Sequence, residues 1–183
     1  MNFLNWNARG LNSYKKRQIL HDILVDHHID ILAIQETKKE QFTNRILRTI
    51  STRFDVWYWV PSVGRSGGIL FGCDSSLINC ISHSIHKFAL NVHVENKIDG
   101  QKWQITIVYG PVIRTLKKEL WIELNHIRGT HSEPWILCGD FNAIRHRDEK
   151  SGNLFDITTS ARFNRFVSTH QLIEQKLNGR KYT

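Results

Sequence analysis

The stretch Asp30–Glu36 (DILAIQE) decides the fold class, because it is an almost unbroken apolar run that ends in an acid. A strand with this composition is expected to be covered on both faces. A second run, Trp135–Asn142 (WILCGDFN), ends in the acid Asp140 and the amide Asn142. Acids at the ends of apolar strands are costly to bury unless a partner balances their charge. A divalent cation and a phosphate group would supply that balance.

Helical and strand patterns alternate around these two runs. Amphipathic periodicity predicts helices over 14–27, 38–50, 115–128 and 159–170. Apolar or alternating segments predict strands over 2–6, 30–36, 54–60, 69–71, 77–85, 88–95, 103–109 and 135–138. A glycine-containing turn is expected at 64–68, a polar loop at 145–157, and a hairpin in the tail at 172–183, where Asn178-Gly179 is a turn signal. Central hairpins flanked by β-helix-β units predict an α/β protein of two packed sheets with helices outside, rather than one doubly wound parallel sheet.

Length and charge bound the class of protein. The 183 residues suffice for one domain, 1–183, and 40% of them are hydrophobic. The net charge of +8 is spread along the chain and suits a polyanionic partner such as nucleic acid, although ordinary solubilising charge explains it about as well. The three cysteines form no metal-spaced pair, which indicates free thiols in a reducing compartment. There is no secretory signal and no apolar run long enough to cross a membrane.

Five polar positions stand at the predicted strand ends. They are Asn7, Glu36, the Ser66-Gly67-Gly68 segment, Tyr109, and the pair Asp140 and Asn142. Each alone has an ordinary structural explanation, such as a turn cap, an amphipathic core residue or an Asx turn. As an ordered set on neighbouring strand ends they are expected to converge on one rim of the sheets. Asp140 and Asn142 are two residues apart, so in an extended chain their side chains would point the same way.

This ordered set resembles the endonuclease/exonuclease/phosphatase superfamily. The motifs are Trp-Asn-Ala-Arg-Gly-Leu, Ile-Gln-Glu-Thr-Lys, Ser-Gly-Gly, Val-Tyr-Gly-Pro and Gly-Asp-Phe-Asn. They look most like the endonuclease domain of plant LINE-type (non-LTR) retrotransposons. The resemblance covers essentially the whole chain and implies a DNase I-like fold, which is a four-layer α/β sandwich of two mixed sheets flanked by helices.

The resemblance also implies roles for the matching residues. Glu36 would bind a divalent cation, Mg²⁺ or Mn²⁺, and Asp140 would orient or deprotonate the attacking water. Asn7 and Asn142 would hold the phosphate and the Asp140 carboxylate, and Tyr109 would donate to a phosphate oxygen. The reaction would be in-line displacement at a DNA phosphodiester.

One departure from the family pattern bears on activity. The family completes its site with a later Asp and a C-terminal Ser-Asp-His segment, and neither is found in this sequence. His146 and His170 sit in no matching motif. The sequence is therefore expected to be C-terminally truncated, without its final strands, and impaired in catalysis. A phosphatase or phosphodiesterase of the same fold and a non-catalytic nucleic-acid-binding remnant remain alternatives.

Four cations flank the motif loops and are candidates for contacts with DNA phosphates: Arg9, Lys38, Arg65 and Arg114. Each is equally compatible with a solvated surface charge. We expect a DNA partner, no membrane partner, and an intracellular location; the nucleus is one candidate compartment, although the sequence carries no targeting signal. The sequence leaves the oligomeric state and the cleavage specificity open.

Overall fold

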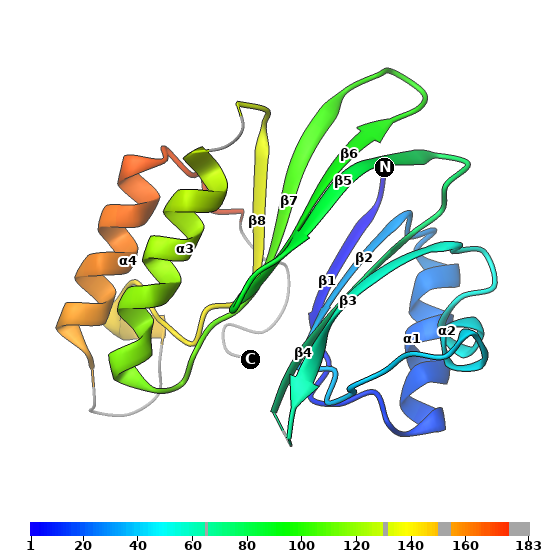
Figure 1. The fold of residues 1–183 in the computed structure, drawn as a ribbon, viewed down its shortest axis with the longest axis horizontal. Helices are drawn as coiled ribbons and strands as arrows, with labels where there is room; N and C mark the ends of the chain where they lie inside the picture. The colour runs from blue at the N-terminus through cyan, green and yellow to red at the C-terminus, as the bar shows by residue number, and fades with distance from the viewer. Residues whose placement is uncertain (65, 130–131, 150–154, 176–183) are drawn as a thin grey trace.

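The computed structural model describes residues 1–64, 66–129, 132–149 and 155–175, and they form four layers (Figure 1). Two sheets face each other in the middle, and a pair of helices covers the outer face of each. The predicted α/β sandwich of two mixed sheets is confirmed. No helix of the described residues has the length and apolar character that a membrane crossing requires.

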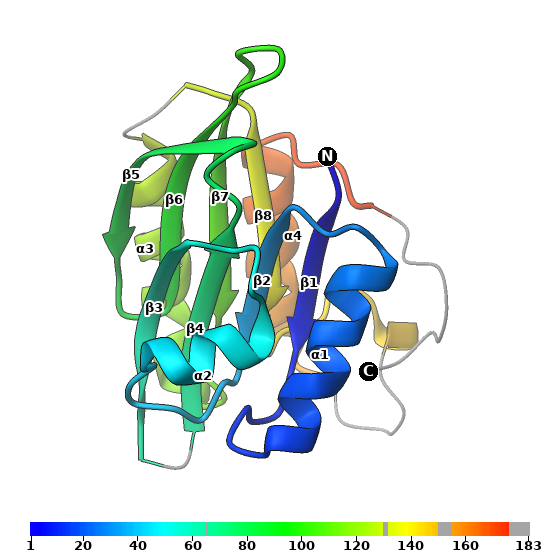
Figure 2. The same cartoon turned by 90° about the vertical axis from the view of Figure 1, so that its right-hand side faces the viewer.

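The first sheet is built from the N-terminal part of the chain. Its strands lie in the order β1 (Phe3–Asn7), β2 (Ile31–Gln35), β4 (Ser66–Cys73) and β3 (Val56–Val63). β1 and β2 are parallel, whereas β4 runs antiparallel to β2 and β3. Helices α1 (Tyr14–Asp26) and α2 (Asn44–Ile50) cover its outer face (Figure 2).

The second sheet is built from the following part of the chain, and its strands lie in sequential order. Its strands are β5 (Ile78–Ile85), β6 (Ala89–Asn96), β7 (Lys102–Tyr109) and β8 (Trp135–Asp140). β7 and β8 are parallel, and the other pairs are antiparallel. Helices α3 (Lys117–Gly129) and α4 (Ile157–Thr169) pack on its outer face, and two short 3₁₀ turns, η1 (Arg114–Leu116) and η2 (Arg147–Glu149), lie beside them.

Three apolar clusters hold these layers together. One lies between the sheets and includes Phe71, Leu90 and Ile107, which are fully buried. The other two lie under the helix pairs, around Leu20 in the first and Leu124 in the second. Because the inner faces of both sheets are apolar along most of their length, polar inward-facing residues stand out where the strands end.

The predicted helix at 38–50 is wrong in its first half. α2 begins at Asn44, where Thr43 accepts a hydrogen bond from the Ile46 amide through Oγ1 at 3.3 Å. Residues 36–43 form a loop instead, in which Lys38 has φ of +53°, a value that no helix contains. Phe42 is still buried, but it reaches the core from this loop and packs edge-on against Trp59.

Smaller differences lie at other boundaries. β4 begins at Ser66 rather than at residue 69, so the end of the predicted glycine turn is strand, and β8 continues to Asp140. The polar loop at 145–157 contains η2, and α4 begins at Ile157, after Asp156 caps it. The hairpin predicted around Asn178-Gly179 lies outside the described residues, although α4 and the start of the tail lie within them.

Candidate functional site

The carboxyl ends of four strands meet at one rim of the sandwich. β1 and β2 from the first sheet lie against β7 and β8 from the second, and all four end at this rim. The closest link across it is a hydrogen bond of 2.7 Å from Asn7 Nδ2 to Asp140 Oδ2. These two residues are 133 positions apart in the sequence, and the bond is partly buried.

The Asp140 carboxylate is held at both oxygens. Oδ2 accepts from Asn7, and Oδ1 accepts from the backbone N–H of Asn142 at 2.9 Å. The amide of Asn7 is itself oriented, because its Oδ1 accepts from the backbone N–H of Arg9 at 3.2 Å. A carboxylate oxygen has more than one acceptor position, so Asp140 retains acceptor capacity after these contacts.

Asn142 acts on Asp140 through its backbone rather than its side chain. The chain is not extended here, as Asn142 has φ of +48°, so the extended geometry on which the expectation of parallel side chains depended is absent. Its side-chain Nδ2 donates instead to the Gly110 carbonyl at 2.8 Å. Lys117 Nζ donates to the Asn142 carbonyl at 2.7 Å, which further fixes this turn.

Tyr109, the last residue of β7, pairs with Asp140 of β8 across the sheet and is close enough to both acids of the site to feel their charge. Burial raises the pKa of Tyr109, and the negative charges of Glu36 and Asp140 raise it further. The backbone N–H of Gly67 donates a hydrogen bond to the Tyr109 oxygen, which opposes part of that rise. The hydroxyl is therefore a protonated donor at neutral pH, and both carboxylates lie near enough to influence it.

Glu36 follows β2 directly and is paired with a cation. Its Oε1 lies 2.9 Å from Lys38 Nζ, and the two side chains are 18% and 36% exposed. The backbone of both residues is left-handed, with φ of +53°. Such values are uncommon outside glycine and persist only where neighbouring structure enforces them.

Hydrogen bonds from two neighbouring segments enforce this loop. The Gly10 N–H donates to the Glu36 carbonyl at 2.6 Å, and the Lys38 N–H donates to the Gly67 carbonyl at 3.1 Å. Between them, Thr37 is fully buried, and its N–H donates to the Gly68 carbonyl at 3.1 Å. A Cβ at Gly68 would lie 2.2 Å from Thr37 Oγ1, so this position requires glycine. The Ser-Gly-Gly motif thus permits the close approach that sets Glu36 in place.

The four candidate DNA contacts are distributed unequally. Arg9 is exposed and Lys38 half-buried; Arg9 lies two residues after Asn7, the end of β1, and Lys38 lies in the loop that carries Glu36. Arg114 is exposed and pairs with Asp156 at 3.2 Å, where Asp156 caps the start of α4. Arg65 lies outside the described residues.

Three features of the site were not predicted from the sequence: the buried Gln35, the contact of Lys117, and the requirement for glycine at position 68. Gln35 is buried on the inner face of β2, where its Nε2 donates to Asn5 Oδ1 at 2.7 Å. Its Oε1 has no hydrogen-bond partner among the described residues. A polar residue at an inward-facing position of an apolar strand was the available signal for Gln35, whereas nothing local marked Lys117.

The oxygen donors at this rim fit a hard divalent cation. Mg²⁺ is usually held by one or two carboxylates and keeps several waters. Glu36 offers such a carboxylate, which already attracts the Lys38 ammonium. In the described part of the chain no three His, Cys, Asp or Glu side chains are grouped to enclose a metal. The Glu36 carboxylate is a hard oxygen donor of the type that Mg²⁺ and Mn²⁺ prefer.

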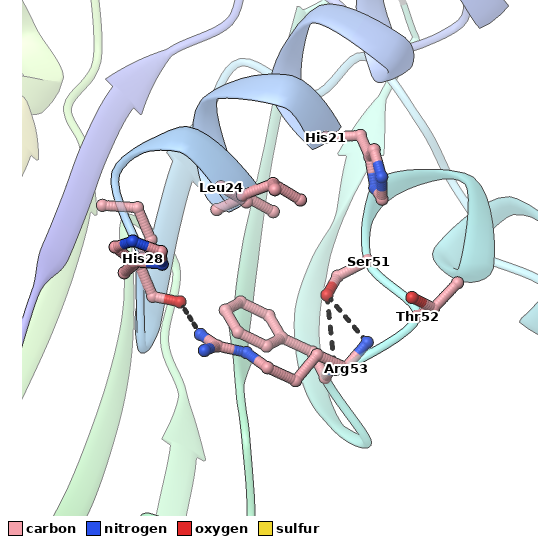
Figure 3. Close-up of a pocket in the computed structure, with 9 residues that line it drawn as sticks. His21, Leu24, His28, Ser51, Thr52 and Arg53 are labelled. Carbon is pink, nitrogen blue, oxygen red and sulfur yellow. Dashed lines mark hydrogen bonds between the residues drawn. The ribbon is translucent and has the colours of Figure 1, made fainter.

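A separate hollow of about 160 Å³ lies outside this site, between the end of α1 and the segment after α2 (Figure 3). Leu24 and Phe54 give it apolar walls, and His21 lies at its edge. The Arg53 guanidinium donates to the Ile29 carbonyl on one side of it. None of the strand-end polar residues lines this hollow, so the hollow is not part of the candidate site.

The two facing mixed sheets, the outer helices and the polar strand ends define a DNase I-like α/β protein. The profile of the Endonuclease/Exonuclease/phosphatase family matches residues 4–170, and the chain belongs to that family. A search of curated protein sequences found no match.

Solved structures with the same fold have diverse activities. An AP endonuclease from Archaeoglobus fulgidus has a TM-score of 0.69 at 17% identity, over 92% of this chain and 71% of that one. A mannosyl-6-phosphatase from Bacteroides thetaiotaomicron has a TM-score of 0.63 at 15% identity, over 91% and 70%. TDP2 of D. rerio, solved with a single-strand DNA product, has a TM-score of 0.60 at 18% identity. This chain is 78% covered in that match and spans 60% of the TDP2 chain. At these identities the likeness establishes the fold alone.

Proposed function

We propose that the protein is a divalent-metal-dependent phosphodiesterase that cleaves DNA, of the kind found in the endonuclease domains of plant LINE-type retrotransposons. The observation that carries the proposal is the 2.7 Å hydrogen bond from Asn7 to Asp140, which joins the two sheets beside Tyr109. It fixes one carboxylate at the rim while that carboxylate keeps acceptor capacity. The net charge of +8 supports a polyanionic substrate over a small phosphate ester.

Each residue has a distinct task in this proposal. Asp140 accepts a proton from the attacking water, while Asn7 and the Asn142 backbone hold its carboxylate in one orientation. Tyr109 donates its hydroxyl proton in a hydrogen bond to a phosphate oxygen, because its raised pKa keeps it protonated. Glu36 would hold the cation, which would offset the negative charge that develops on the phosphoryl oxygens.

The lysine beside Glu36 also has a place in this arrangement. A cation that binds Glu36 competes with the Lys38 ammonium for the same carboxylate. Once displaced, Lys38 remains in the loop that carries Glu36 and can meet a DNA phosphate, as can Arg9 in the adjacent loop. Arg114 and Arg65 complete the proposed set of DNA-binding cations.

The test is nicking of supercoiled plasmid in Mg²⁺ by the chain and by Asp140→Asn, with Asp22→Asn as the matched control. Asp22 lies exposed on α1, so its substitution removes the same charge away from the rim. We expect Asp140→Asn to lower the nicking rate by about 10²–10⁴-fold, the range for loss of a general base. Equal nicking by both variants would contradict the role of Asp140.

A second arm decides the substrate. Turnover of inositol or lipid phosphates with intact plasmid would reject DNA as the substrate. Binding of DNA that weakens with salt, without turnover of any substrate, would reject catalysis while leaving a nucleic-acid-binding protein.

A further inference from the structure

Two thiols meet between the sheets at a position unrelated to the candidate site. Cys73 is the last residue of β4 in the first sheet, and Cys80 lies in β5 of the second. Their sulfur atoms are 3.5 Å apart, within the apolar cluster that separates the sheets. A disulfide bond has a sulfur–sulfur length of about 2.05 Å, so the pair is short of bonding by about 1.5 Å.

The local structure leaves room for that approach. β5 is an edge strand, and in the described residues its only strand partner is β6. The pairing of β5 with β6 shifts register between Cys80 and Ser82, which marks a bulge directly after the cysteine. Bulges at sheet edges bend the strand and change the direction in which a side chain points. A small movement of this edge is enough to bring the two sulfurs together.

The two thiols are chemically unequal. Cys73 is fully buried, whereas Cys80 is half-buried. The hydrogen bond between them lowers the pKa of Cys80 and raises that of Cys73, and burial raises the pKa of Cys73 further. Cys80 is therefore the thiol that ionises and can be reached. Burial raises the pKa of the third cysteine, Cys138, to about 12.

We propose that Cys73 and Cys80 are a reversible oxidation site, at which a hydroperoxide converts the two thiols into a disulfide between the sheets. The Cys80 thiolate attacks the peroxide oxygen, giving a sulfenic acid and one molecule of water or alcohol. The Cys73 sulfur then attacks the Cys80 sulfur and expels hydroxide, which takes up the Cys73 proton as water. The thiols lose two electrons in total and the peroxide gains them. A dithiol reductant reverses the reaction.

This site lies far from the polar rim. Gly67 is the β4 residue whose amide meets Tyr109, and Cys73 is six residues further along the strand. At 3.3–3.4 Å per residue the separation is about 20 Å. The disulfide would therefore fix the far end of the two sheets without altering the Asn7–Asp140 contact, and it stands independently of the proposed nuclease function.

The sequence permits a direct test, because cleavage before aspartate places each cysteine in a different peptide. The three peptides are 55–73, 74–98 and 99–139, which contain Cys73, Cys80 and Cys138 respectively. The chain is treated with hydrogen peroxide, its remaining thiols are alkylated, and the digest is compared with and without dithiothreitol. We expect peptides 55–73 and 74–98 to be linked, at the mass of their sum less two hydrogen atoms, and to separate on reduction.

Two variants and a stability measurement complete the test. Cys138→Ser should keep the link, and Cys80→Ser should abolish it without creating one to Cys138. The oxidised wild-type chain should melt about 5 °C above the reduced chain, because the disulfide restricts the unfolded chain. The effect is modest because the loop between Cys73 and Cys80 is short. Three alkylated thiols after peroxide, a link that includes Cys138, or only intermolecular dimers would overturn the proposal. The wild-type digest decides it even where a variant fails to fold.

Discussion

Replacing Gly68 with alanine is expected to destabilise the fold and disturb the loop that carries Glu36. Gly68 has φ of +87°, which costs a residue with a side chain roughly 1–3 kcal/mol. The new Cβ would also lie 2.2 Å from Oγ1 of Thr37, which is fully buried and cannot move aside freely. Overpacking of this kind costs about 1–3 kcal/mol. Together these terms predict a loss of about 2–6 kcal/mol.

Gly67→Ala separates the two causes. Gly67 has nearly the same backbone, with φ of +83°, but the nearest atom to its new Cβ would be Tyr109 Cε1 at 3.8 Å, an ordinary contact. The free energy of unfolding of both variants is measured by urea denaturation. We expect Gly68→Ala to be less stable than Gly67→Ala by about 1–3 kcal/mol, the cost of the clash alone.

The same clash can be relieved from the other side. Thr37→Ala removes the oxygen that the new Cβ would meet, so the double variant with Gly68→Ala should be more stable than the two single losses predict. The expected coupling is about 1–3 kcal/mol, within the range seen for contacting residues. Equal stabilities for the two glycine variants, together with simple additivity in the cycle, would refute the close-approach explanation of the Ser-Gly-Gly motif.

Three further predictions concern charge. Lys38→Met should bind Mg²⁺ up to about fivefold more tightly by calorimetry, because a partly exposed ion pair at the surface is worth about 1 kcal/mol or less, while Lys39→Met should not. Tyr109→Phe should lower plasmid nicking by about 10²–10³-fold, and wild-type nicking should show no loss from Tyr109 ionisation below pH 10, since its pKa is raised. Burial raises the pKa of Glu123, so the folded state binds more protons there than the unfolded state. Stability should therefore fall as pH rises through that raised pKa, and Glu123→Gln should flatten this slope in denaturation at several pH values.

The elements that were predicted well from the sequence are those whose pattern of apolar residues directly indicates which residues are buried. The apolar run at 30–36 became the fully buried strand β2, and the stripe containing Leu120 and Leu124 became the buried face of α3. The prediction of a helix from residue 38 was wrong because the conformation of its first residues is set by hydrogen bonds to residues far away in the sequence. Lys38 is held in a left-handed conformation by the Gly67 carbonyl, 29 positions away, and no local propensity reports such a bond.

The same contrast between local pattern and distant contacts applies to the candidate site. Its motifs could be found in sequence because four of them lie at the carboxyl end of a strand and the Ser-Gly-Gly motif opens β4, and the strands bring them to one rim. How they act there could not be found. Asn142 meets Asp140 through its backbone, and Glu36 is paired with Lys38, the residue at which spacing predicted the start of a helix. Both outcomes depend on positive φ values that tertiary hydrogen bonds impose.

The division of the chain between the sheets has a consequence for folding. Strands β1–β4 come from residues 3–73 and β5–β8 from residues 78–140, so each sheet can form from a contiguous stretch of chain. The bond from Asn7 to Asp140 closes a loop of 133 residues and forms only when the finished sheets dock. Contacts between residues far apart in sequence slow folding. During refolding, catalytic activity should therefore appear only after the secondary structure of both sheets is complete. Its rate of recovery would report the docking of the two sheets and not the formation of either sheet alone.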